Sequence, residues 1–181
     1  MKKLIIFLTL FLSNISTAET LLWYHDGGKT IDHPQLVETI ENVLKTLPAG
    51  KIRNMDKLVH ETLMVETTCG SHDYTYASVN WKNYGIAQIR ADTAMWLLDT
   101  LFRTDRSRFS EIYKYYDPET SMEHNLMCNV PFSIAICAEL YHHRLKGHPL
   151  NTLHERALAW KKHYNTYKGA GTVNYYIAKN S

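Results

Sequence analysis

Apolar residues recur at helical spacing along most of the chain. The clearest run lies between Asp32 and Leu47, where apolar side chains return every three or four positions. Its apolar positions are Leu36, Val37, Ile40, Val43, Leu44 and Leu47. Pro34 near its first turn and Pro48 beyond its end are typical of helix boundaries. The pattern predicts an amphipathic helix with one face on the core.

Five further helical segments are predicted. One starts at Asn54 or Asp56 and runs towards Glu66, with residues 69–71 as its stop. Asp92 is expected to cap the next helix, whose predicted inward residues are Met95, Leu98, Leu101 and Phe102. The others are a short helix over 109–116, a buried helix over 132–141, and a helix over 151–163 capped by Asn151. A short aromatic segment, 173–177, ends the chain.

Residues 72–89 break the helical pattern. Tyr74, Tyr76 and Val79 alternate with polar positions, and Asn83 and Gly85 follow, which is typical of a loop or small β-hairpin. The chain has no internal repeat and no obvious linker. The fold class is therefore predicted to be mainly α, in a single domain with a small hairpin region.

The first 18 residues have the pattern of a secretory signal peptide. Lys2 and Lys3 precede the apolar run Leu4–Leu12, and Ser16-Thr17-Ala18 resembles a cleavage site. A spanning helix needs about 20 apolar residues, and Thr9 and Ser13 interrupt this run. We expect cleavage near Ala18, no stable membrane anchor afterwards, and a periplasmic or secreted protein.

Removal of this segment leaves residues 19–181 with balanced charge. The chain has 20 Lys and Arg and 18 Asp and Glu, and the segment contains two lysines and no acid, so 18 of each remain. Nucleic-acid binding needs a surplus of clustered basic residues. The balance argues against nucleic acid as a partner, and the length suits one domain.

Three cysteines, Cys69, Cys128 and Cys137, fall within residues 19–181. In an oxidising compartment two of them could form a disulfide and leave one thiol. The sequence leaves all three pairings open.

Glu66 is the acid whose surroundings suit catalysis. It is placed near the end of a predicted helix, beside the apolar Leu63 and Val65. Partial desolvation and the negative end of a helix both raise the pKa of a carboxyl group towards the range of a general acid. This local pattern by itself would not distinguish Glu66 from an exposed glutamate at a helix end.

Other segments strengthen the case for Glu66. Gly85-Ile86-Ala87-Gln88-Ile89 follows after a loop, Thr93-Ala94 opens the next helix, and Tyr164-Asn165 lies near the C-terminus with Gly169 and Gly171 behind it. In order and spacing, this set resembles the lytic transglycosylase and goose-type lysozyme superfamily. The resemblance covers roughly residues 50–178.

The resemblance implies a lysozyme-like fold and a peptidoglycan substrate. A lytic transglycosylase cleaves the β-1,4 bond between MurNAc and GlcNAc and leaves 1,6-anhydromuramic ends, with a single Glu as acid and base. That chemistry needs no metal, no cofactor and no second carboxylate. Glu66 would take this role, and Tyr164 would hydrogen-bond or orient it. The residues expected to bind substrate are Thr67, Tyr84, Gln88, Tyr164 and Asn165. Tyr74, Tyr76 and Trp81 could stack on sugar rings or simply pack.

The sequence departs from the family pattern at three places. Ala87 stands where Met is frequent, Thr67 replaces the usual Ser, and residues 166–168 lengthen the step from Asn165 to the first glycine. We expect these changes to alter the shape of the sugar-binding groove more than the catalytic chemistry.

Two alternative functions stay open. Asp73 or Asp92 could supply a second carboxylate for a lysozyme-type hydrolase, or the chain could be a non-catalytic peptidoglycan-binding or assembly protein. A small exported enzyme would suit local opening of the wall for a secretion or conjugation complex. A zinc-protease motif is excluded, since Met64 stands where His60-Glu61 would require the second histidine. Most of the ten histidines are expected in solvated or interface positions.

Overall fold

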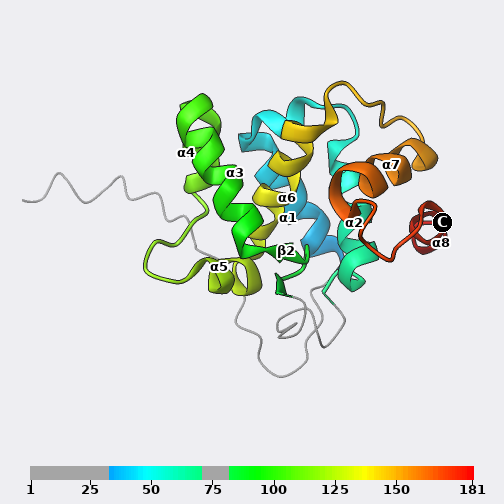
Figure 1. The fold of residues 1–181 in the computed structure, drawn as a ribbon, viewed down its shortest axis with the longest axis horizontal. Helices are drawn as coiled ribbons and strands as arrows, with labels where there is room; N and C mark the ends of the chain where they lie inside the picture. The colour runs from blue at the N-terminus through cyan, green and yellow to red at the C-terminus, as the bar shows by residue number, and fades with distance from the viewer. Residues whose placement is uncertain (1–32, 71–81) are drawn as a thin grey trace, which may run out of the picture.

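The computed structural model describes residues 33–70 and 82–181, and it confirms a mainly helical architecture (Figure 1). The predicted signal peptide and residues Asp73, Tyr74, Tyr76 and Trp81 lie outside the described residues. In chain order the elements are α1 (His33–Thr46), the 3-10 helix η1 (Pro48–Lys51), α2 (Met55–Thr67), β1 (Asn83–Tyr84), β2 (Ile89–Arg90), α3 (Ala91–Thr104), α4 (Arg106–Tyr113), α5 (Met122–Cys128), α6 (Val130–Leu145), α7 (Leu153–Trp160), the π-helix η3 (Lys161–Asn165) and α8 (Val173–Lys179).

Helix α6 lies at the centre of the molecule and contacts helices α1 to α5 (Figure 1). Twelve of its 16 residues are buried, which confirms the predicted buried helix. One of them is the charged Glu139, whose carboxylate accepts hydrogen bonds from Arg108 of α4 and from the backbone N–H of Ala49. A buried carboxylate needs such partners to offset its lost hydration. No helix in the described ranges is long and apolar enough to cross a bilayer.

Helices α1 and α2 match their predicted ranges closely. The predicted face of α1 is buried at Leu36, Ile40, Val43 and Leu44, whereas Val37 is partly exposed at its edge. Helix α2 ends at the predicted stop, because Thr68, Cys69 and Gly70 all have positive φ. Residues in this left-handed conformation cannot continue an α-helix.

The prediction for α3 is partly wrong. The helix begins at Ala91, so Asp92 lies in its first turn and forms an ion pair with Arg90 instead of capping it. Met95 and Phe102 are 51% and 42% exposed, although both were expected to point inward. The residues that do face the core are Ala91, Ala94, Leu97, Leu98 and Leu101. Ala94 is fully buried, so a small side chain lies on this face in place of the large Met95.

The C-terminal third differs from prediction in three details. Helix α7 begins later than expected, with a capping box of Thr152 and Glu155 in place of Asn151. Its continuation over Lys161–Asn165 is a π-helix, a distortion frequent at functional sites. Helix α5, capped by Ser121, was not predicted, since seven residues are too short to show a clear period.

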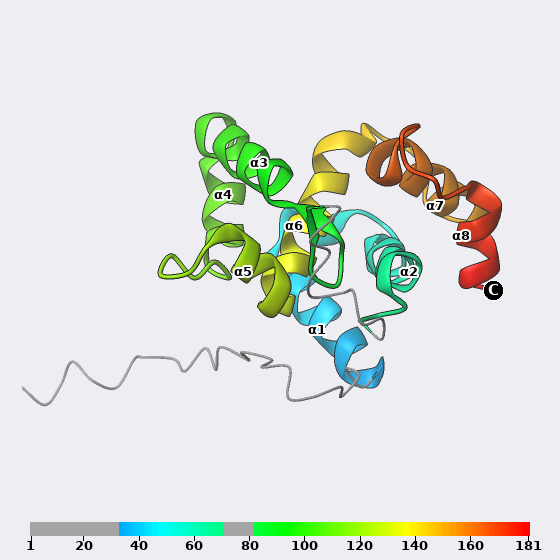
Figure 2. The same ribbon diagram turned by 60° about the horizontal axis from the view of Figure 1, so that its bottom comes forward.

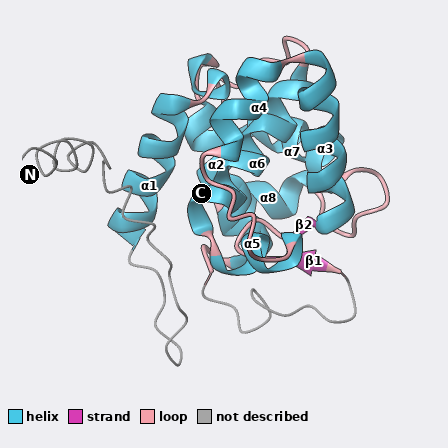
Figure 3. Ribbon diagram, turned by 90° about the vertical axis from the view of Figure 1, so that its left-hand side faces the viewer, coloured by secondary structure: helices cyan, strands magenta, loops and turns pink. Residues whose placement is uncertain are grey.

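The predicted hairpin region contains a two-stranded antiparallel sheet, β1 with β2, beside α5 (Figure 3). Asn83 pairs with Arg90, and Tyr84 pairs with Ile89. Gly85 starts the turn with φ +69°, and a Cβ at this position would lie 1.7 Å from the backbone oxygen of Leu126. Only glycine therefore allows the turn to lie against α5.

Candidate active site

Glu66 is partly buried one residue before the end of α2. Its Oε1 accepts a hydrogen bond of 3.0 Å from the indole Nε1 of Trp160 in α7. Burial raises the pKa of Glu66 from 4.5 to about 7, although the indole N–H acts in the opposite direction by stabilising the carboxylate. The rise in pKa agrees with the prediction and leaves the group partly protonated near neutral pH, while its role as a general acid stays a prediction.

Thr67 joins the end of α2 to the hairpin segment. Its hydroxyl donates to the backbone oxygen of Ile86 at 2.8 Å and accepts from the backbone N–H of Gly70 at 2.9 Å. Thr67 has no accessible surface, so the structure shows a supporting role for it, whereas the predicted substrate contact stays a prediction. Its hydrogen bond holds the Gly85–Ile89 segment against the end of α2, the helix that carries Glu66; Figure 2 shows the hairpin strand beside α2.

Tyr164 holds the same segment from the other side. Its hydroxyl donates to the backbone oxygen of Ala87 at 2.6 Å, and its ring stacks on Tyr141 of α6 with centroids 5.2 Å apart. A hydroxyl has one proton to donate, so Tyr164 does not donate to Glu66 as the resemblance implied. Trp160 makes that contact. Burial raises the pKa of Tyr164 well above its usual value, and the nearby Glu66 charge adds to this.

Three of the four segments that carry the resemblance thus converge on one place, namely Glu66-Thr67, Gly85–Ile89 and Tyr164-Asn165. Thr67 and Ile86 are 19 positions apart, Tyr164 and Ala87 are 77 apart, and Trp160 and Glu66 are 94 apart. Figure 1 shows the underlying arrangement, with α7 beside α2. Glu66 is thus a partly buried acid whose carboxylate accepts one hydrogen bond, from Trp160. The Gly85–Ile89 segment is held by two hydrogen bonds, one from Thr67 and one from Tyr164.

Tyr84 and Gln88 keep accessible surface on this segment. Gln88 has φ +49°, a conformation that costs energy for a residue with a side chain, and its Nε2 donates to the backbone oxygen of Gly85 at 2.9 Å. Tyr84 lies in β1 and packs partly on the core. Both positions are compatible with the predicted contact to a sugar.

Asn165 lies beneath the loop that follows the π-helix. Its Oδ1 accepts a hydrogen bond from Lys161, which also donates to the backbone oxygen of Gly169, both at 2.8 Å. A Cβ at Gly169 would lie 2.3 Å from Asn165 Oδ1, and one at Gly171 would lie 2.4 Å from the ring of Trp160. The two glycines therefore let the loop close over these side chains. The Oδ1 of Asn165 is engaged in holding this loop, whereas a direct substrate contact stays a prediction.

Sequence reasoning missed Trp160 and the buried network that positions it. Glu61 of α2 accepts two hydrogen bonds from Arg156 of α7, at 2.7 and 2.6 Å, and one from Tyr176 of α8 at 3.0 Å. This network attaches α7 to α2 and brings Trp160 to Glu66. The signal was present, because Trp160 precedes Tyr164 by four residues and such side chains share one helix face.

Asp92, one candidate for a second carboxylate, is exposed and paired with Arg90, whose hydrogen bond holds the pKa of Asp92 below its usual value. A hydrolytic role for Asp92 receives no support from this geometry. Asp73, the other candidate, lies outside the described residues.

All three cysteines are free thiols, so the disulfide considered from the sequence is not formed. Cys137 is fully buried in α6 beside Tyr164, whereas Cys69 follows α2 and lies near His33 and His60. Burial raises the pKa of Cys137 to about 12 and that of Cys69 to about 11, which leaves both thiols protonated and unreactive.

No protein-family model matches the chain, and searches of curated proteins and of solved structures found no match. Any assignment of function therefore depends on the residues and their geometry.

Proposed function

We propose that this chain is an exported peptidoglycan lytic transglycosylase with Glu66 as its acid and base. The observation that carries the proposal is the convergence on Glu66 of segments far apart in sequence. A carboxyl group with a pKa of about 7 receives the Trp160 N–H, while Thr67 and Tyr164 fasten the Gly85–Ile89 segment alongside it. The same segments carry the resemblance to the lytic transglycosylases.

The proposed reaction uses the Glu66 carboxyl group twice, first as an acid and then as a base. Glu66 donates its proton to the glycosidic oxygen as the bond to C1 of MurNAc breaks, and the bonding electrons leave with that oxygen. The substrate's own acetamido group can stabilise the resulting positive centre. The Glu66 carboxylate then takes the proton of the muramyl 6-hydroxyl, whose oxygen bonds to C1 and closes the anhydro ring. The Trp160 N–H stabilises the carboxylate between the two transfers.

A surface hollow beside the hairpin could hold a neighbouring sugar. It encloses about 280 Å³ and is lined by Arg90, Asp92, Thr93, Trp96 and Arg144. Trp96 is 45% exposed, and such a ring offers a face on which a sugar can stack. The charged side chains around it can hydrogen-bond to sugar hydroxyls.

Digestion of purified peptidoglycan tests the proposal. The wild type should release soluble fragments, and Glu66→Gln should be slower by about 10²- to 10⁴-fold, the usual contribution of a general acid. Glu38→Gln makes the same change at an exposed position of α1 and should retain full activity. Equal rates for wild type and Glu66→Gln would refute the role of Glu66. Binding of peptidoglycan without any released fragment would instead favour the non-catalytic alternative.

The pH profile gives an independent check. Because the proton-donating form of Glu66 is lost as pH rises through its pKa, cleavage should decline above about pH 7. A decline that begins above about pH 4.5 instead of pH 7 would show that Glu66 titrates as an ordinary solvated glutamate.

A further inference from the structure

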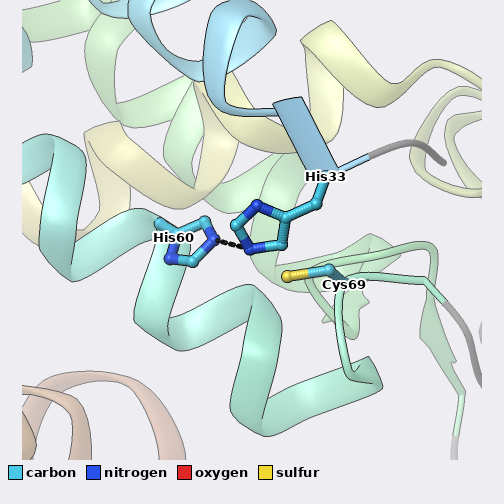
Figure 4. A group of neighbouring side chains, drawn as sticks. All are labelled: His33, His60 and Cys69. Atoms are coloured by element: carbon cyan, nitrogen blue, oxygen red, sulfur yellow. Dashed lines mark hydrogen bonds between the residues drawn. The ribbon is translucent and has the colours of Figure 1, made fainter. Parts of the chain in front are cut away.

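A second cluster of chemically active side chains lies where the start of α1 meets α2 (Figure 4). His33 is the first residue of α1, His60 lies in α2, and Cys69 follows the end of α2. The Nε2 atoms of the two histidines are 2.9 Å apart, and one ligand atom from each of the three residues lies within 4.8 Å of the others. None of these residues belongs to the Glu66 site.

We propose that His33, His60 and Cys69 bind a divalent transition-metal ion, with zinc as the best fit. Two imidazoles and one thiolate are donors that Zn²⁺ prefers. With Zn–N of about 2.05 Å and Zn–S of about 2.3 Å, tetrahedral geometry places the two nitrogens about 3.3 Å apart and each nitrogen about 3.6 Å from sulfur. The cluster reaches these distances if the nitrogens separate slightly and the sulfur moves about an ångström. His33 is exposed, so its ring has room to rotate.

Metal binding at this cluster needs a neutral imidazole at His60 and the loss of the Cys69 proton. Burial and the neighbouring His33 both lower the pKa of His60, so its ring is neutral at physiological pH. Metal ions bind neutral imidazole and deprotonated thiolate. A bound cation would also reverse the effect of burial on Cys69, whose proton would be released as sulfur binds the ion. Each ion bound should therefore release one proton from Cys69.

The ion would stabilise the segment next to Glu66. Cys69 lies three residues beyond Glu66, in the left-handed turn that ends α2, and the following Gly70 donates to Thr67. A metal ion that joins this turn to the start of α1 would hold the left-handed turn in place. The turn adjoins Thr67, whose hydroxyl accepts from Gly70 and donates to the backbone oxygen of Ile86 in the hairpin segment. Three protein ligands leave a fourth position on the ion, which water can fill. Because none of the three ligands belongs to the Glu66 site, we expect the ion to act on the turn and not on the bond that is cleaved.

Cobalt titration of the purified full chain tests the proposal, because Co²⁺ occupies zinc sites and reports a bound thiolate by its charge-transfer absorption. We expect one ion per chain, a thiolate-to-cobalt band, and displacement by Zn²⁺. Cys69→Ser should lose the band, whereas Cys128→Ser, a half-buried cysteine elsewhere, should keep it. His33→Asn should weaken binding at least about tenfold, since even outer-shell changes cost that much. His154→Asn, at an exposed position of α7, should bind as the wild type does.

Circular dichroism of each variant separates loss of the site from loss of the fold. If Cys69→Ser unfolds, the cobalt affinity of His33→Asn tests the proposal, because His33 is exposed and its replacement removes no buried packing. Cobalt binding without the thiolate band would overturn the proposal, as would equal affinity of the wild type and His33→Asn.

Discussion

Replacement of Glu66 by glutamine should stabilise the folded protein above pH 7 and have little effect below pH 4.5. The pKa of Glu66 rises from 4.5 to about 7 on folding, because burial disfavours the carboxylate. Below pH 4.5 the side chain is protonated in both the folded and the unfolded states, so neutral glutamine is a close substitute. Between these pH values the folded state holds the proton more tightly, and the stability of the wild type falls as pH rises. Glutamine carries no such penalty.

The size of the effect follows from the pKa. Each tenfold change in proton affinity is worth about 1.4 kcal/mol, so the full rise corresponds to up to about 3 kcal/mol of unfolding free energy. The hydrogen bond from Trp160 is already included in this value, and the amide oxygen of glutamine can accept the same bond. The predicted gain is large, since whole domains are stable by about 5–15 kcal/mol.

Urea unfolding followed by circular dichroism measures this gain. The wild type, Glu66→Gln and the exposed control Glu38→Gln are compared near pH 4 and near pH 8, where the linkage is respectively absent and complete. Only Glu66→Gln should have a higher free energy of unfolding at the higher pH. The slope of this free energy against urea concentration should stay unchanged. A difference between Glu66→Gln and wild type that is the same at both pH values would refute the argument that burial raises this pKa.

Three further changes test the scaffold of the site by urea unfolding and by peptidoglycan cleavage. Gly85→Ala should destabilise the protein by about 2 kcal/mol or more, because its φ is positive and the added Cβ meets the backbone of α5; an unchanged midpoint would contradict this. Arg156→Met should lower the free energy of unfolding by about 3–5 kcal/mol, because the buried Glu61 carboxylate loses its cationic partner. An unchanged free energy of unfolding would mean that Glu61 is solvated. Tyr164→Phe should cost about 1–3 kcal/mol and slow cleavage, because the buried carbonyl of Ala87 loses its donor. Full activity in Tyr164→Phe would show that the hairpin segment needs no such anchor.

The sequence predicted most of the helical framework. Helices α1, α2 and α6 were found because their apolar positions and their stop residues agree. The inward face of α3 was partly wrong, since the alanine at 94 rather than the large Met95 or Phe102 lies against the core. Periodicity shows that a helix has two faces, but close packing decides which side chains fit between neighbours.

The candidate site was predictable only where its chemistry is local. Apolar neighbours on the same helix predicted a raised pKa for Glu66, and burial raises it in the structure. The contacts of Trp160, Thr67 and Tyr164 depend on residues 94, 19 and 77 positions away, so no local pattern contains them. The ion pair of Glu61 and Arg156 that aligns α7 is equally distant in sequence.

Cleavage of peptidoglycan in water enriched in heavy oxygen tests the central claim most directly. Transglycosylation by Glu66 adds no water, so mass spectrometry should find 1,6-anhydromuramic ends that carry no heavy oxygen, and Glu66→Gln should release almost none of them. Reducing muramic ends that carry heavy oxygen would instead identify a hydrolase, and equal yields from both proteins would contradict the assignment of Glu66.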